Sequence, residues 1–263
     1  MSLRSYSGPA PSVRPSSVAL GFSWLLAVAT IGLQIAFPLV ADTNRATMAA
    51  ITVAVFFLAS VVHATACHRW RGFLVVGLVV PAIGWGVERL GSTSGIPFGD
   101  YTYTDALGPD LYGVPLVVPL AWAMMAYPAH VAASALAWRR WLIPLVTAWS
   151  LMAWDLFLDP MMVDADAWRW TTTTPDLPGI EGIPVVNYAG WLAAGVVIGI
   201  AMLLLPTQRT PIGQPAALYL WVYISSVVSA ALFFERPGSA IAGGVAMGLV
   251  AIPFSWRLWL DRI

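Results

Sequence analysis

The feature that most constrains this chain is a series of eight apolar runs, each long enough to cross a lipid bilayer. A helix needs about 20 predominantly apolar residues to span the hydrocarbon core. The pattern therefore predicts an all-α fold, a polytopic transmembrane bundle of about eight helices. The runs lie at 17–40, 46–68, 72–90, 114–138, 141–159, 185–206, 214–234 and 238–260.

Composition supports lipid as the solvent of this chain. Of its 263 residues 59% are hydrophobic and 10% are charged, whereas a soluble domain carries about a quarter charged residues. We expect one transmembrane domain over 17–263, preceded at 1–16 by a disordered tail rich in Ser, Pro, Gly and Arg. The run at 17–40 exceeds the apolar core of about 7–15 residues typical of a signal peptide, so we interpret it as a retained helix.

Arginine placement predicts the orientation of the bundle. Eight spans put nine arginines on one side and four on the other, and the positive-inside rule then places both termini in the cytoplasm. Of the 13 acids, Asp261 alone falls on the arginine-rich side. Abundant Arg and Ala with no Lys is typical of a GC-rich bacterial genome, so we expect a multi-pass protein of a bacterial cell membrane.

Several kinds of chemistry are excluded by what the sequence lacks. A net charge of zero offers nothing to nucleic acid. The absence of lysine excludes a retinal Schiff base, a lysine nucleophile and a pyridoxal-phosphate linkage. Cys67 is the lone cysteine, which excludes an internal disulfide and a four-cysteine metal site. His63, His68 and His130 fall away from the acids, and the pair His63 and Cys67 has no third ligand nearby, so we interpret them as structural.

Two long connections on the acid-rich side, 91–113 and 160–184, are rich in Gly, Pro, Thr, Tyr and Trp. Such loops over a helical scaffold often carry function. Each follows a helix that ends in acids, and each leads into a similar helix start, GVPLVVPLAW at 113–122 and GIPVVNYAGW at 182–191. Four identities in ten positions fit a parallel repeat and chance equally well.

Three acids are candidates for catalysis. Asp155 and Asp159 are four residues apart and share one helix face. Asp155 falls one turn inside an apolar span, where an ionisable group is costly and usually functional; Asp159 alone fits an ordinary helix end equally well. Burial and a like-charged neighbour favour a protonated carboxyl group, which can serve as a general acid. Glu88 ends its helix at a matching depth, and we favour a functional role over an ion pair with Arg89 or Arg236.

Aromatic residues accompany these acids. Trp85, Trp122 and Trp154 lie within spans near the acids, where aromatic faces can stabilise a cation by about 2 kcal/mol or more when desolvated. Trp168 and Trp170 are assigned instead to the aromatic belt at the membrane interface. A dry pocket with carboxylic acids and aromatic walls suits a reaction that passes through a carbocation.

The segments GWGVERLGSTSGIPFGDYTYTDALGPDLYGVPLVVPLAW (84–122), AWDLFLDPMM (153–162) and GIPVVNYAGW (182–191) carry a specific resemblance. They resemble the membrane-embedded carotenoid biosynthesis family that contains bisanhydrobacterioruberin hydratase and γ-carotene 1′-hydratase. One departure is the stretch 171–184, which is longer before its Gly-Ile-Pro than is typical of the family, and it leaves that loop's shape and the end-group choice open.

The resemblance implies hydration of the terminal C1=C2 bond of an acyclic carotenoid ψ-end to a tertiary alcohol, with no metal or organic cofactor. Protonation at C2 would give a tertiary cation at C1 that water captures. The partners implied are a lipophilic carotenoid, membrane lipid and other enzymes of the carotenoid pathway. An extended carotenoid is about as long as the ~30 Å hydrocarbon core, so one end can lie at the acidic face.

These arguments together assign roles to individual residues. We expect Asp155 or Glu88 to be the general acid and Asp159 to orient or deprotonate the water. Trp85, Trp122 and Trp154 are expected to stabilise the cation. Asn187 is expected to hold water or the new hydroxyl. The remaining candidates for contact with the substrate are Tyr101 and Tyr103.

Other functions compete with this hypothesis. A carotenoid end-group cyclase shares the protonation step but ends in proton loss, and the residues barely separate the two reactions. A small proton-coupled transporter could use Asp155 and Glu88 as relay sites, although transport sites usually lie near the midplane rather than at one face. A non-catalytic membrane scaffold gives no reason to hold Asp155 inside a span.

Overall fold

The computed structural model describes residues 15–206 and 210–260. The tail predicted at 1–16 therefore lies outside the described residues except for its last two positions. Asp261 and three of the arginines used to predict the orientation lie at the chain ends, outside the described residues. Arg209 falls in the internal gap at 207–209. Within the described part, eight helices are long and apolar enough to cross a membrane, which confirms the predicted number.

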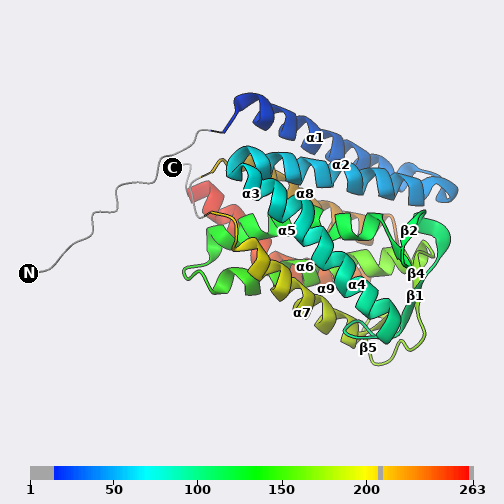
Figure 1. The fold of residues 1–263 in the computed structure, drawn as a ribbon. Helices are drawn as coiled ribbons and strands as arrows, with labels where there is room; N and C mark the ends of the chain where they lie inside the picture. The colour runs from blue at the N-terminus through cyan, green and yellow to red at the C-terminus, as the bar shows by residue number, and fades with distance from the viewer. Residues whose placement is uncertain (1–14, 207–209, 261–263) are drawn as a thin grey trace, which may run out of the picture.

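The helices run side by side, as Figure 1 shows. The third span is one continuous helix in which a π-helical stretch, η2, joins α3 to α4. The start of α1 and the end of α9 lie at the same end of the bundle, opposite the strands (Figure 1). The bounds are α1 Ser17–Ala36, α2 Asp42–His68, α3 Trp70–Gly72, η2 Phe73–Val79, α4 Val80–Ser94, α5 Val117–Leu136, α6 Leu142–Asp164, α7 Val185–Met202, α8 Gly213–Leu232 and α9 Pro237–Leu260.

Helices α5 and α6 form the centre of the bundle, since two thirds of the residues in each span are buried, against 17% in the first span. Small residues allow the surrounding helices to approach closely. A Cβ atom at Gly195 of α7 would lie 2.7 Å from the Cα of Ala148 in α6, and one at Gly243 of α9 would lie 2.6 Å from the Phe157 ring. Side chains on α6 are thus held between two tightly packed neighbours.

Two helix ends differ from the expectation. Helix α4 continues to Ser94, and α6 continues through Pro160 to Asp164 instead of ending at 159. A proline removes one helical hydrogen bond, but neighbouring helices in a membrane bundle can compensate for that loss. The connections over the acidic end are therefore 95–116 and 165–184, each shorter at its start than predicted.

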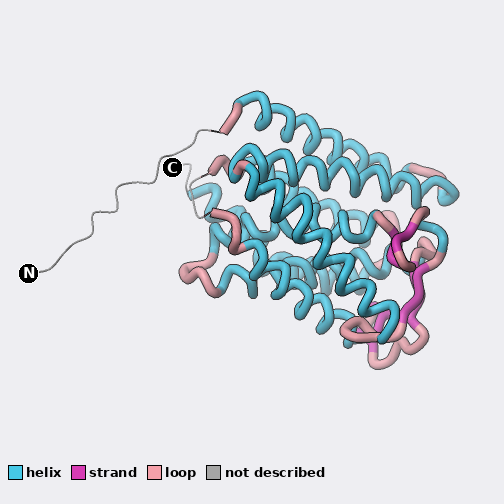
Figure 2. The backbone as a smooth tube through the Cα atoms, in the orientation of Figure 1, coloured by secondary structure: helices cyan, strands magenta, loops and turns pink. Residues whose placement is uncertain are grey.

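These two connections pair with each other, which the sequence did not indicate. Strand β1 (Tyr101–Tyr103) runs antiparallel to β4 (Trp168–Trp170), with Tyr101 opposite Trp170 and Tyr103 opposite Trp168. Each connection also has its own hairpin, β2 (Asp110–Leu111) with β3 (Val114–Pro115) and β5 (Asp176–Leu177) with β6 (Ile180–Pro184). Figure 2 shows the strands gathered at one end of the bundle, where they form a cap. Short 3-10 turns also occur at η1 (Phe37–Leu39) and η3 (Asp105–Leu107).

The two similar helix starts also have a similar local course. Gly113 and Gly182 both adopt a positive φ, 78° and 85°, which favours glycine. Each is followed by strand residues and then by a helix, α5 or α7. The tryptophans at the tenth position of each segment, Trp122 and Trp191, stack with ring centroids 3.9 Å apart. This correspondence favours a parallel repeat over chance.

Candidate active site

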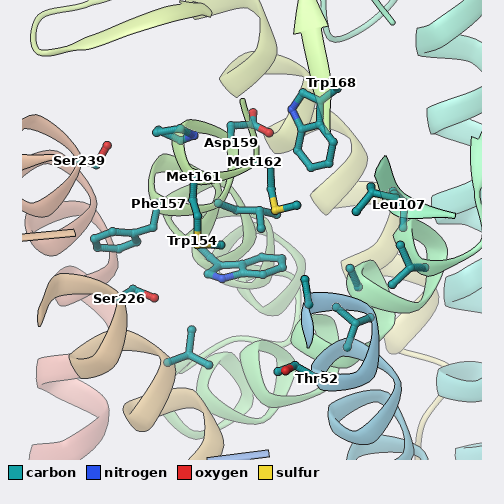
Figure 3. Close-up of a pocket in the computed structure, with 18 of the residues that line it drawn as sticks. Thr52, Leu107, Trp154, Phe157, Asp159, Met161, Met162, Trp168, Ser226 and Ser239 are labelled. Atoms are coloured by element: carbon teal, nitrogen blue, oxygen red, sulfur yellow. The ribbon is translucent and has the colours of Figure 1, made fainter. Parts of the chain in front are cut away.

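A cavity lies between the strand cap and the helices, and its walls come from segments far apart in the sequence. Tyr101 and Trp170 line it from the cap, while α2, α5, α6, α7 and α8 supply most of the remaining wall. Figure 3 shows Asp159 and Trp168 on one side, Trp154 near the centre, and Thr52 and Ser226 further away. The lining is predominantly apolar, so the few polar side chains in it are conspicuous.

Three acids gather at this cavity, and they are the acids that are buried among the described residues. Glu88, Asp155 and Asp159 are 6%, 0% and 2% exposed. Glu88 and Asp159 line the cavity, and Asp155 lies one helical turn from Asp159 on α6. Glu88 interacts electrostatically with both aspartates. The described residues contain no group of His, Cys, Asp and Glu side chains placed to hold a metal ion.

Glu88 is held by three donors. The hydroxyls of Tyr101 and Tyr103 each donate to Oε2 at 2.6 Å, and the indole N–H of Trp122 donates to Oε1 at 2.8 Å. The ion pair with Arg236 that we weighed for Glu88 does not form, because Arg236 donates to Asp164 through Nε at 2.8 Å. Donors on both oxygens favour an ionised carboxylate.

The two tyrosines are positioned to remain donors. Burial raises the pKa of Tyr101, and the neighbouring Glu88 carboxylate raises it further. The same two causes raise the pKa of Tyr103 well above its ordinary value. Both phenols therefore keep their protons at neutral pH and point them at Glu88.

The aspartates are arranged differently. The side-chain amide of Asn187 donates to Asp155 Oδ2 at 2.9 Å and also to Asp159 Oδ2, so one donor serves both carboxyl groups. Among the described residues, no N–H or O–H donor reaches Asp155 Oδ1. Two carboxyl groups close enough to share one amide repel each other when both are ionised, which favours one proton for the pair. The pair is thus built to hold one proton.

Trp168 completes the surroundings of Asp159, beside which it lies in Figure 3. Its side chain is 8% exposed and lines the cavity. Trp170 also lines the cavity, and its indole N–H donates to the Phe98 carbonyl at 3.0 Å. The assignment of these two tryptophans to an interfacial belt is therefore wrong, because the pairing of β1 with β4 folds them over the site.

Aromatic rings surround the acids. Trp122 stacks on Trp191, and Trp191 meets Trp154 edge to face with centroids 6.0 Å apart. All three line the cavity, as does Phe98. Trp191 and Phe98 were not among the predicted site residues, although the helix-start similarity paired Trp191 with Trp122.

Of the predicted site residues, Trp85 alone lies apart from the others. Its indole N–H donates to the Leu111 carbonyl at 3.1 Å, and its ring meets Tyr112 edge to face. It is absent from the cavity lining. Trp85 therefore fastens the β2–β3 hairpin to α4. The predicted residues that the structure brings together are Glu88, Tyr101, Tyr103, Trp122, Trp154, Asp155, Asp159 and Asn187.

The histidines form a separate polar cluster away from the acids. His63 Nδ1 lies 2.8 Å from the Tyr127 hydroxyl and 3.9 Å from Cys67 Sγ. His130 Nε2 lies 3.4 Å from the hydroxyl of Ser134. The contact between His63 and Tyr127 joins α2 to α5, and the other two lie within one helix each, which agrees with a structural role.

The fold and site define a multi-pass helical membrane protein with a buried acid cluster in an aromatic cavity. The sequence model of the carotenoid biosynthesis protein family matches residues 44–253, and the chain belongs to that family. The chain is also similar to bisanhydrobacterioruberin hydratase from Haloarcula japonica, with 30% identity over 196 residues. That match covers 74% of this chain and 65% of the relative's length. No solved structure matches the chain significantly.

Proposed function

We propose that this protein is a carotenoid hydratase that adds water to the terminal C1=C2 bond of an acyclic carotenoid ψ-end without a cofactor. The observation that carries the proposal is the buried pair of Asp155 and Asp159, whose carboxyl groups share the Asn187 amide beside an aromatic cavity. Family membership supports a role in carotenoid biosynthesis, and the name of the haloarchaeal relative supports hydration as the particular reaction.

The aspartate pair is the proposed proton donor. An alkene carbon is a weak base, so a donor must be a neutral acid held against it in a site without bulk water. Asp155 is fully buried, and Asp159 presents the pair to the cavity. Transfer of the shared proton to C2 forms the new C–H bond and leaves the positive charge at C1.

Glu88 and the indoles then stabilise the cation. A fixed carboxylate with three donors needs no reorganisation when positive charge develops, which is the condition for effective electrostatic catalysis. The faces of Trp154 and Trp191 add to this stabilisation. Water attacks C1, and the proton that leaves the oxonium returns to the acid cluster, so the net change is the addition of one water.

The substrate's polyene would extend away from the acids. The cavity continues between α2 and α8 to Thr52 and Ser226, and outside it the bundle presents apolar side chains to lipid. We propose a single transmembrane domain over 17–263, lying in a bacterial cell membrane with both termini in the cytoplasm. An insoluble polyene would then enter the cavity sideways from the membrane. We expect other enzymes of the carotenoid pathway to be partners of this protein.

Expression in a bacterium that accumulates an acyclic carotenoid tests the proposal. Chromatography and mass spectrometry should find a more polar pigment heavier by one water, made by the wild type and lost in Asp155→Asn. A Trp85→Phe chain is the matched control, because Trp85 lies outside the cavity and should leave the product unchanged.

The same experiment separates the alternatives. A pigment of unchanged mass with a cyclic end group would identify a cyclase and contradict hydration. Unchanged pigment with wild-type protein present in the membrane would leave the transporter as the better account. Hydrated product of wild-type amount from both Asp155→Asn and Glu88→Gln would overturn the residue assignment.

A further inference from the structure

The α8–α9 side of the cavity carries hydroxyl groups that the acid cluster does not use. Ser226 and Ser229 lie one turn apart on α8, and Ser239 lies near the start of α9. All three line the same cavity as Glu88 and Asp159. Figure 3 shows Ser226 and Ser239 at the left of the view, with Asp159 and Trp154 to their right.

The hydroxyl of Ser239 differs from most other buried hydroxyls of the bundle. Thr52, Thr147 and Ser150 each donate to a backbone carbonyl four residues earlier in the same helix, which satisfies the hydroxyl. Ser239 is 1% exposed, and within the described residues its Oγ has no hydrogen-bond partner. Leaving a buried hydroxyl without a partner costs free energy, so such a group indicates a missing ligand.

The surroundings suit a small neutral oxygen ligand rather than an ion. The neighbouring wall is apolar, with Phe157, Val222 and Phe234 lining the cavity beside the serines. Arg236 is the cation that lines this cavity, and it is engaged by Asp164. A buried water requires two to four polar partners, and a group of serine hydroxyls supplies both donors and acceptors.

We propose that Ser226, Ser229 and Ser239 bind the water that attacks the carbocation. The inference rests on the proposed hydration. The proton from the aspartate pair forms the C2–H bond, the water oxygen forms the C1–O bond with its lone pair, and the released proton returns to the acid cluster. The serines are positioning residues, since they act on the water and not on the carotenoid.

This assignment gives the enzyme a way to separate hydration from proton loss. A tertiary cation without a positioned nucleophile loses a neighbouring proton and reverts to an alkene. Water held in place shifts that partition toward the alcohol through proximity. The serines should therefore control the fate of the cation but not its formation.

Membranes that contain the protein and an acyclic carotenoid, incubated in D2O, test the water site. The wild type should yield alcohol with deuterium at C2. The triple variant Ser226→Ala, Ser229→Ala, Ser239→Ala should lower alcohol formation about tenfold, the order expected for lost hydrogen bonds to the water. Deuterium should still appear in recovered alkene, because protonation and its reversal continue.

The matched control is Ser225→Ala. Ser225 also lines the cavity, but its hydroxyl donates to its own helix at the Val222 carbonyl, so alcohol yield should stay at the wild-type level. Ser239→Thr, tested alone against Ser239→Ala, should restore the ratio of alcohol to exchanged alkene because it keeps the hydroxyl.

Two results would overturn the water site while leaving hydration intact. One is alcohol formation by the triple variant at the wild-type rate. The other is an equal fall in alcohol and in deuterium exchange, which would mean that the serines support the acid or the fold. If the wild type forms neither alcohol nor exchanged alkene, the proposed function itself fails.

Discussion

Glu88 and the pair of Asp155 and Asp159 are buried to the same degree in the same cavity, yet their surroundings are opposite. Glu88 accepts from two phenols and an indole, so both of its oxygens have donors. The aspartates share the single amide of Asn187, and Asp155 Oδ1 has no N–H or O–H donor among the described residues.

The difference teaches that burial alone does not assign a role to an acid. Donors directed at a carboxylate stabilise its charge, while repulsion between two neighbouring carboxylates favours retention of a proton. We therefore propose that the three acids divide into a fixed negative charge, Glu88, and a proton store, the aspartate pair. Carbocation chemistry needs both, one to form the cation and one to stabilise it.

The largest effect is expected from removing the proton store. Asp155→Asn leaves Asp159 with the Asn187 amide as donor and no carboxyl partner, so Asp159 should ionise and cease to donate. Because general acids contribute about 10²–10⁴-fold to rate, product formation should fall by that order. The measurement is pigment composition at equal protein level. A product amount within threefold of the wild type would contradict the assignment of the aspartate pair as the proton donor.

Removing the fixed charge should cost less. Glu88→Gln keeps the size of the side chain but replaces the carboxylate with a neutral amide, so the cation loses its nearest negative charge. We expect the initial rate to fall about 10- to 100-fold, less than for Asp155→Asn, on the scale of single electrostatic contributions in enzymes. Rates in isolated membranes check the order. A larger loss from Glu88→Gln than from Asp155→Asn would reverse the two roles.

The donors to Glu88 should have smaller effects. Tyr101→Phe or Tyr103→Phe removes one of three hydrogen bonds to the carboxylate, which is worth up to about tenfold when a single bond is lost. The double variant should lose more than either single one, since the two phenols share Oε2. Relative rates of the three variants sharpen the comparison. No change in the double variant would mean that Glu88 is not held by these donors during the reaction.

The smallest effect is expected at Trp85, which was predicted to stabilise the cation but lies against Leu111 and Tyr112. Trp85→Phe should change the rate less than about twofold, while Trp154→Phe, inside the cavity, should lower it further because cation stabilisation by an indole exceeds that by a phenyl ring. Rates measured in parallel for Trp85→Phe and Trp154→Phe test this order. Equal losses would place Trp85 functionally with the cavity.

The spans and the acids could be predicted because they follow from strong, local free-energy rules. Lipid requires about 20 apolar residues per helix, which gives the number of spans directly. An acid inside such a span is costly, which singles out Asp155. The end of α6 was missed because a proline such as Pro160 normally ends a helix. In this bundle the neighbouring helices allow α6 to continue past Pro160 to Asp164.

The donors around the acids could not be predicted, because they depend on contacts between distant segments. Trp168 lies beside Asp159 (Figure 3) only because β4 pairs with β1. Helical spacing gives a side chain's face on its own helix but not the neighbour that the face meets, and for that reason Trp85 was placed in the site and Trp191 was left out.

Infrared spectroscopy of the purified protein tests the division of roles most directly, through the C=O band of a protonated carboxylic acid. The account predicts the band in the wild type and in Glu88→Gln, and its loss in the double variant Asp155→Asn, Asp159→Asn. A band that survives in the double variant and disappears in Glu88→Gln would contradict the account, because the proton would then reside on Glu88.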